Sequence, residues 1–302
     1  MRPENLDSLT ITLIHAGFGC NDKVLIEIIS QRTNEDLQLL RRAYQSEFGR
    51  DLIEDIKSET GANFERILCA LLWTRAEADA HSLRKAFEGV GARIEPLIET
   101  LVHRTKEERE AIKAAYLQMY GKTLQHDIEK ELGGDNERLF VALINNTPQE
   151  LPLDVPYLEQ VADDLFKRGE GKWGTDEVGF ITTLTSCSPV FLKEVNIVYA
   201  LRHSHSLVAA IGHEMGGSLA KTLKALISDH DEYYADLFWK SMEGAGCNED
   251  MLMRIIASRR HKLRGISRAF IHKYGCGMKH KIDKEMGNGD FGKVVKEITK
   301  GF

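Results

Sequence analysis

The feature that most constrains the fold of this chain is a glycine turn that is followed by a glutamate about 40 residues later. This pattern occurs four times. The last glycines of the turns are Gly19, Gly91, Gly174 and Gly246. The glutamate follows at plus 40 in the first three copies and at plus 39 in the fourth, as Glu59, Glu131, Glu214 and Glu285. A repeat of roughly 70 residues is the mark of an array of similar units, so the fold must be read as a repeat array.

Other positions keep the same register. Position plus 13 holds Arg32, Arg104, Cys187 and Arg259, and an aromatic residue near plus 25 recurs as Tyr44, Tyr116, Tyr199 and Phe270. Near plus 30 stand Gly49, Gly121 and Gly275, with Ser204 in the third copy. We expect the arginines to tie helix ends to turn carbonyls rather than to contact a ligand, and the aromatic residues to lie in the core.

Apolar residues recur at helical spacing throughout. In the first copy Val24, Leu25, Ile28 and Ile29 share one face, and Asn34 is a candidate cap for the next helix. The pattern predicts five helices per copy and no convincing strand, hence an all-α fold. Residues 147–156 hold three of the six prolines and read as an extended linker. The expected repeats are 1–75, 76–146, 157–228 and 229–302.

The third copy shows the chemistry of the turn most clearly, in the stretch KWGTDE from Lys172 to Glu177. Thr175 is the expected cap of the helix that follows, and glycine allows the turn to point several carbonyls outward. Outward carbonyls with one carboxylate, here Glu214, form a hard oxygen site of the kind that Ca²⁺ takes. The weaker alternative is that the glycines only end helices and the glutamates are solvated.

Charge and composition narrow the function. The net charge is −6 with no basic stripe, which argues against a nucleic-acid partner. An anionic membrane should repel such a surface slightly unless a cation bridges the two. The five cysteines are odd in number and unpaired in pattern, so we expect reduced thiols. There is no apolar run near the ~20 residues that span a bilayer and no signal peptide, so we expect a cytoplasmic protein.

Together these residues resemble the annexin family. KWGTDE in the third copy and MEGAGCNED in the fourth, Met242 to Asp250, are close to the family's forms, and the likeness covers essentially the whole chain. The resemblance implies a curved disc of four five-helix repeats whose convex face carries calcium turns. It also implies reversible, Ca²⁺-dependent binding to anionic phospholipid membranes by a cytosolic protein.

The resemblance also implies ligands, which we carry over by position. The carbonyl ligands and their glutamates would be His15, Gly17 and Gly19 with Glu59; Phe87, Gly89 and Gly91 with Glu131; the loop Glu170, Lys172 and Gly174 with Glu214; and Met242, Gly244 and Gly246 with Glu285. In the third copy the first ligand is left open. The turn-tip residues Phe18, Trp173 and Ala245 would face the membrane, although Trp173 folded back on its own surface is an equal alternative.

The turns depart from the family's pattern in ways that bear on lipid preference. The family's lysine before the first glycine is replaced by Ala16, Glu88, Gly171 and Glu243. Threonine survives only as Thr175. In the second copy Ala92 and Arg93 stand where a cap is expected and cannot provide one.

Two classes of function remain. The favoured one is a calcium-dependent membrane-binding protein, and the alternative is a calcium-independent helical scaffold that binds proteins such as the cytoskeleton. No catalytic motif is found, so we do not expect an enzyme. His203, His205 and His213 lack a metal-binding pattern and are expected at a solvated helix end. We expect a monomer in solution and leave self-association on membranes open.

Overall fold

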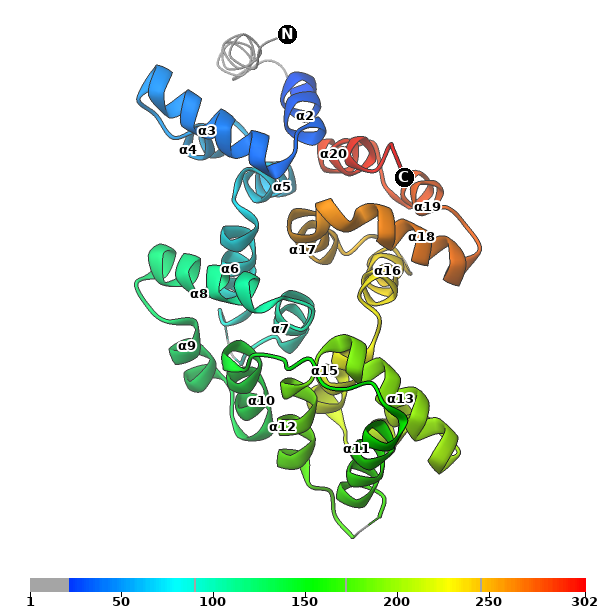
Figure 1. Ribbon diagram of the computed structural model, residues 1–302. Helices are drawn as coiled ribbons and strands as arrows, with labels where there is room; N and C mark the ends of the chain where they lie inside the picture. Colours follow the sequence, from blue (N-terminus) through cyan, green and yellow to red (C-terminus); the bar gives the residue numbers. More distant parts are fainter. Residues whose placement is uncertain (1–21, 90, 172, 245) are drawn as a thin grey trace. The chain divides into compact units, whose positions relative to one another are not determined.

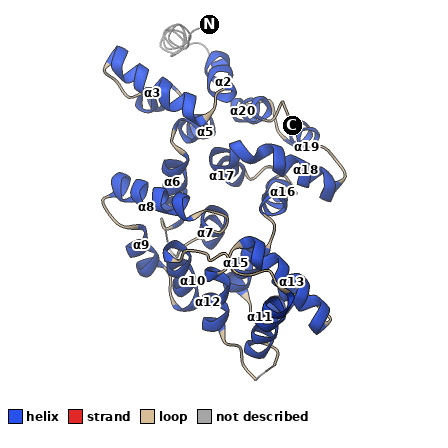
Figure 2. Ribbon diagram, in the orientation of Figure 1, coloured by secondary structure: helices blue, strands red, loops and turns tan. Residues whose placement is uncertain are grey.

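The computed structural model describes residues 22–89, 91–171, 173–244 and 246–302, and these form helices and loops without a strand (Figures 1 and 2). The chain divides into two compact units, residues 1–79 with 234–302 and residues 80–233. Each of the second, third and fourth repeats contributes five α-helices. No helix among the described residues is both long and apolar enough to cross a bilayer.

The first unit joins the first and fourth repeats. Its helices are α2 (Asp22–Gln31), α3 (Asn34–Phe48), α4 (Leu52–Glu59), α5 (Ala62–Leu72), α17 (Glu249–Arg259), the short 3₁₀ helix η1 (Arg260–Lys262), α18 (Leu263–Tyr274), α19 (Met278–Glu285) and α20 (Asp290–Ile298). Helix α2 packs on α20 and α5 packs on α17. The sequence expectation of an earlier helix around Leu6 to Leu13 lies outside the described residues.

The second unit joins the second and third repeats. Its helices are α7 (Ile94–Leu101), α8 (Lys106–Tyr120), α9 (Leu124–Glu131), α10 (Gly134–Asn145), α11 (Val155–Arg168), α12 (Glu177–Ser186), α13 (Pro189–His203), α14 (Leu207–Glu214) and α15 (Gly217–Ile227). Helices α6 (Arg75–Ala86) and α16 (His230–Ser241) cross from one unit to the other. The segment expected as a linker is extended at Gln149, which bridges to Cys187, but α11 already begins at Val155 with Pro156 in its first turn.

The long third helix of each repeat has clear start and stop signals. Thr33 and Thr105 each form a capping box with the acidic residue three positions later. The expectation that Asn34 caps α3 is therefore wrong. Its side chain instead bonds the carbonyl of Trp73 at 2.7 Å. The repeated position near plus 30 ends each of these helices in the left-handed conformation, at Gly49, Gly121, Ser204 and Gly275.

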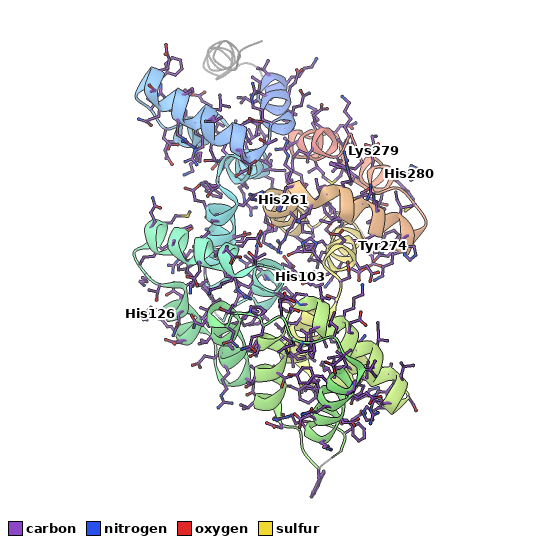
Figure 3. The ribbon with its side chains drawn as sticks, viewed as in Figure 1. His103, His126, His261, Tyr274, Lys279 and His280 are labelled. Carbon is purple, nitrogen blue, oxygen red and sulfur yellow. The ribbon has the colours of Figure 1, made fainter. Side chains whose placement is uncertain are left out.

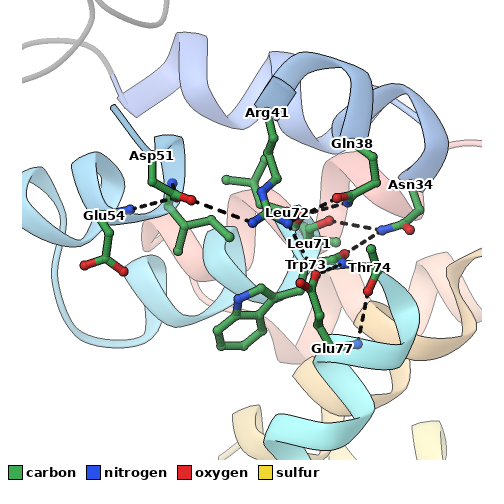
Figure 4. A network of polar contacts seen from close by, with 11 residues as sticks. Asn34, Gln38, Arg41, Asp51, Glu54, Leu71, Leu72, Trp73, Thr74 and Glu77 are labelled. Carbon is green, nitrogen blue, oxygen red and sulfur yellow. Dashed lines mark hydrogen bonds and ion pairs between the residues drawn. The ribbon is translucent and has the colours of Figure 1, made fainter. Parts of the chain in front are cut away.

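The third helix also holds the end of the fifth. Figure 4 shows Asn34, Gln38 and Arg41 of α3 reaching the last carbonyls of α5, with Gln38 2.8 Å from the oxygen of Leu72. In the second repeat Lys113 occupies the register position of Arg41 and donates to the Ile144 carbonyl at the end of α10. The last carbonyls of a helix lack partners within it, so these cations satisfy them and match the negative end of the helix.

The repeated aromatic residues are buried, as predicted. Tyr44, Tyr116, Tyr199 and Phe270 are at most 1% exposed. The hydroxyl of Tyr116 donates to buried Asp127 at 2.6 Å, and Arg84 donates to the same carboxylate at 3.0 Å. Tyr44 bonds Asp55 in the same way at 2.7 Å. Burial and these carboxylates raise the pKa of both tyrosines, so their hydroxyls stay protonated donors.

The repeated arginines lie at helix ends, and the expectation that they bond the turn carbonyls stays a prediction. Arg32 and Arg104 donate to carbonyls four residues earlier, those of Ile28 and Thr100. Arg259 is buried and bonds the Tyr234 hydroxyl, with its guanidinium 4.5 Å from that ring's centroid.

Replacing Tyr116 by Phe should lower the free energy of unfolding by about 1–3 kcal/mol, because buried Asp127 loses one of its two donors. Urea unfolding followed by circular dichroism measures this. Tyr157→Phe is the matched control, since the Tyr157 hydroxyl has no hydrogen bond among the described residues. Equal midpoints for the two variants would show that the Tyr116 bond contributes nothing.

Candidate calcium-binding turns

Each described turn is closed by one backbone hydrogen bond between the two helices that it joins. The amide of Arg93, the residue before α7, donates to the carbonyl of Ala86, the last residue of α6, at 2.9 Å. Asn248 and Ser241 form the same bond at 2.7 Å in the fourth repeat, and Asp176 and Arg168 form it at 2.8 Å in the third. One amide before the second helix and the last carbonyl of the first helix are thus paired, and the residues between them form the loop.

The glycines of the turns adopt backbone angles that side chains disfavour. Gly89 and Gly91 have φ of 105° and 78°, Gly244 and Gly246 have 91° and 101°, and Gly174 has 81°. Within the described residues no hydrogen bond is donated to the carbonyl oxygens of the expected ligands, which are Phe87, Gly89, Gly91, Glu170, Gly174, Met242, Gly244 and Gly246. Such oxygens are free to bind a hard cation.

The third turn is one residue longer than the other two. Its closing bond joins residues eight apart, whereas the bonds of the second and fourth turns join residues seven apart. The first carbonyl ligand of this turn, which the sequence left open, lies in the longer segment. The added length is taken up by Gly169-Glu170-Gly171, where the Gly171 amide bonds the Phe166 carbonyl at 2.8 Å. A side chain at Gly171 would meet the Cα of Lys167 at 2.9 Å, so only glycine fits here.

The four repeated glutamates occupy one structural position. Each is the last residue of an eight-residue helix, as Glu59 of α4, Glu131 of α9, Glu214 of α14 and Glu285 of α19. A carboxylate at the negative end of a helix is not stabilised by the helix, so its partner must come from elsewhere. The partner differs between repeats.

In the third repeat the structure brings Glu214 to the turn. The Thr175 hydroxyl donates to the Glu214 carboxylate at 2.9 Å, and the Cγ of Glu214 lies 3.5 Å from the position a Cβ would take on Gly169. Thr175 therefore does not cap α12, as the sequence suggested. The cap is Asp176, which accepts from the Gly179 amide at 2.9 Å and pairs with Arg168.

The backbone carbonyl and the side chain of Glu170 have different surroundings in this turn. Its carbonyl is free, but its side chain is held by the hydroxyl of Tyr199 at 3.0 Å and by His205 at 2.7 Å. Tyr199 stands where Tyr116 stands in the second repeat, but Ala210 replaces the aspartate, so the tyrosine bonds the turn instead. The expectation that His205 is solvated is therefore wrong. No three His, Cys, Asp or Glu side chains gather as a metal cluster within the described ranges.

In the second and fourth repeats a lysine already neutralises the glutamate. Lys130 lies 2.6 Å from the Glu131 carboxylate, and Lys281 lies 3.1 Å from that of Glu285. The second turn also lacks a capping side chain, as predicted, because Arg93 instead bonds the Lys85 carbonyl. The fourth turn has its predicted cap, Asn248, which accepts from the Met251 amide at 3.0 Å.

Cys247 occupies the position in the fourth turn that Thr175 holds in the third. Burial, together with the nearby charges of Glu249 and Glu285, raises the pKa of the Cys247 thiol to about 11. The residue is therefore a neutral thiol near pH 7 and adds no charge to the turn. Cys69, Cys187, Cys247 and Cys276 are all free thiols.

Trp173 is fully exposed at the tip of the third turn, which contradicts the alternative that it folds back on its own surface. Glu59 is also exposed, at the end of α4. Several expected site residues lie outside the described residues, namely His15, Gly17, Phe18, Gly19, Lys172 and Ala245.

Comparison with known proteins agrees with this geometry. The sequence model of the annexin family matches residues 14–71, 78–143, 160–226 and 233–298. This chain belongs to the annexin family. Human annexin A13 is 34% identical over 284 residues, which cover 92% of this annexin and 90% of that protein. Annexin A7 of Dictyostelium discoideum is also 34% identical, over 286 residues that cover 93% of this chain and 62% of that protein.

The fold is shared as well. The solved structure of annexin III superposes with a TM-score of 0.94 at 30% identity, covering 99% of this chain and 95% of that one. Annexins are known as calcium-dependent phospholipid-binding proteins that associate with membranes peripherally. The comparisons thus support the four-repeat all-α fold and membership of the annexin family. Evidence for the calcium sites of this annexin comes from the geometry of its own turns.

Proposed function

We propose that this annexin binds anionic phospholipid membranes reversibly through Ca²⁺ ions that bridge its glycine turns to lipid phosphates. The observation that carries the proposal is the third turn, where free carbonyls, a positive-φ glycine and the Glu214 carboxylate held by Thr175 come together. Carbonyl and carboxylate oxygens are the ligands that Ca²⁺ prefers.

A lipid phosphate would complete the coordination of the Ca²⁺ ion. Three carbonyls and a bidentate glutamate supply about five of the ~6–8 oxygens that Ca²⁺ takes, and one carboxylate offsets only half of its charge. A phosphate oxygen would supply both the missing ligand and the missing charge. Because the chain carries a net charge of −6, the cation is also what allows it to approach an anionic surface.

The proposed ligands are those of the sequence analysis. In the third repeat the loop Glu170 to Gly174 supplies carbonyls beside Glu214, and in the fourth Met242, Gly244 and Gly246 do so beside Glu285. The second repeat offers Phe87, Gly89 and Gly91 with Glu131. The first offers Glu59 with the turn at Gly17 and Gly19.

Sedimentation with vesicles tests the function. The protein should pellet with phosphatidylserine vesicles in millimolar-range calcium, an order of magnitude that fits sites with a single carboxylate, and a chelator should release it. Phosphatidylcholine vesicles are the control for charge. Equal pelleting with calcium and with chelator would contradict the proposal and favour a calcium-independent scaffold.

The four glutamates should differ in importance. Glu131→Gln should change calcium-dependent vesicle binding least, because the second turn has no side-chain cap, whereas Asp176 and Asn248 cap the helices after the third and fourth turns. Glu59→Gln, Glu214→Gln and Glu285→Gln should each weaken binding clearly, because an amide loses the charge and the bidentate contact. Vesicle titrations of the four single variants rank the sites. If Glu131→Gln were the most damaging variant, the proposed role of the turn would be wrong.

Trp173 should enter the headgroup region of the membrane, since its exposed ring is apolar and carries one polar N–H. Tryptophan fluorescence should therefore shift to the blue only when calcium and vesicles are present together. Trp173→Phe should abolish the shift, while Trp73 and Trp239 provide the background. A shift that persists in this variant would show that Trp173 does not insert.

A further inference from the structure

A cavity of about 640 Å³ opens in the first unit, where the end of α2 meets η1 and the end of α20. Its volume lies in the range of small-molecule sites. Apolar walls come from Leu71, Ala257, Ile298 and Phe302. No described residue of the proposed calcium turns lines it.

Arg260 is the charged group of this cavity that most needs an anion. It donates to the carbonyls of Ile29 and Ser30 at the end of α2, and it has no carboxylate partner among the described residues. Burial lowers its pKa to about 10, so it remains charged near pH 7 at a cost in solvation. A guanidinium has five N–H donors, and these two bonds leave others for a ligand.

Ser30 gives a second, independent indication. It is 2% exposed, it lines the same cavity, and its hydroxyl has no hydrogen-bond partner among the described residues. Buried hydroxyls are usually hydrogen-bonded, because leaving one unsatisfied costs free energy. Because Arg260 bonds the Ser30 carbonyl, the two residues are neighbours in the cavity lining.

The charges around the cavity favour an anion. Its two carboxylates are already paired, Glu35 with Arg75 at 3.3 Å and Glu297 with Lys300 at 3.5 Å. Arg260, Arg32 and His261 also line it, and His261 is labelled in Figure 3. The described lining residues thus include four basic side chains, Arg32, Arg75, Arg260 and Lys300, against two carboxylates.

The corresponding cavity of the second unit differs. It measures about 750 Å³, but its cations are matched by four acidic residues, Glu107, Glu150, Glu194 and Asp229. It also contains a buried arginine, Arg109, which donates to the Asn146 carbonyl. Arg109 is therefore a matched control for an arginine that only caps a helix.

We propose that the cavity of the first unit binds an amphiphilic oxyanion, a phosphate or carboxylate group on an apolar body, without calcium. The oxyanion would accept hydrogen bonds from Arg260 and from the Ser30 hydroxyl. The apolar body would lie against Ala257, Ile298 and Phe302. This site is separate from the proposed membrane function, since it uses neither the turns nor their glutamates.

Calorimetric titration of the full chain in chelator, without vesicles, tests the proposal. The probes are octyl phosphate, octanoate, octyl glucoside and inorganic phosphate. The two charged octyl probes should bind at least about tenfold more tightly than octyl glucoside, which lacks the charge, and than inorganic phosphate, which lacks the apolar body. A difference between octyl phosphate and octanoate identifies the preferred head group.

Single-residue variants test whether the ligand binds in this cavity. Arg260→Gln should weaken octyl phosphate binding roughly tenfold and Ser30→Ala about two- to fivefold, as expected for a charged and a neutral hydrogen bond. Arg109→Gln and Glu214→Gln should leave it unchanged. Because Arg260 also bonds the end of α2, Ala257→Leu provides a second route, filling the cavity while Arg260 is kept, and it should abolish binding.

Three results would overturn the proposal. One is equal binding of octyl phosphate and octyl glucoside, which would mean an apolar contact without anion recognition. Another is unchanged binding in a folded Arg260→Gln variant. The third is equal weakening by Arg109→Gln, which would place the ligand elsewhere.

Discussion

The backbone hydrogen bond that closes each turn is the interaction on which the candidate sites depend. It joins the amide that precedes one helix to the last carbonyl of the helix before it, at 2.7–2.9 Å in the three described turns. This bond fixes the two ends of the loop at a short distance from each other. Glycines at positive φ let the loop carbonyls remain without helical hydrogen bonds. Their oxygens can then act as ligands of a cation.

The carboxylate that completes such a site is placed by a different rule. Each glutamate ends a short helix of the same length, so the repeat fixes its position but not its partner. The Thr175 hydroxyl donates to Glu214, whereas Lys130 and Lys281 form ion pairs with Glu131 and Glu285. The three described sites are therefore expected to differ in calcium affinity through single side chains.

Much of the fold could be predicted from the sequence because glycine, aromatic and apolar residues recur at regular spacing in the four repeats. The buried aromatic residues, the glycines that end the third helices and the Asn248 cap all follow from position and residue type. Competition between neighbouring polar residues was harder to predict. Thr33 rather than Asn34 caps α3, and Asp176 rather than Thr175 caps α12, because in each pair both residue types suit the cap and tertiary partners decide.

The site was predictable to a smaller extent. Lys281 and Glu285 are four apart on a helix, a spacing that signals an ion pair in the sequence itself. The bonds of Tyr199 and His205 to Glu170 join residues 29 and 35 apart in the sequence, and their pairing is evident only in the folded repeat. The extra residue of the third turn was also not predicted. The repeat positions were counted forward from the last glycine of each turn, and the extra residue lies before that glycine.

That extra residue changes how the turn is anchored. The two ends of the turn are fixed by the same hydrogen bond as in the shorter turns, so the added chain does not separate the helices. The Gly171 amide bonds back to the Phe166 carbonyl, which folds the added stretch against the end of α11. Within that stretch the Glu170 side chain bonds Tyr199 of α13 and His205. The loop that carries Trp173 is therefore tied to α13 as well as to the two helices that it joins.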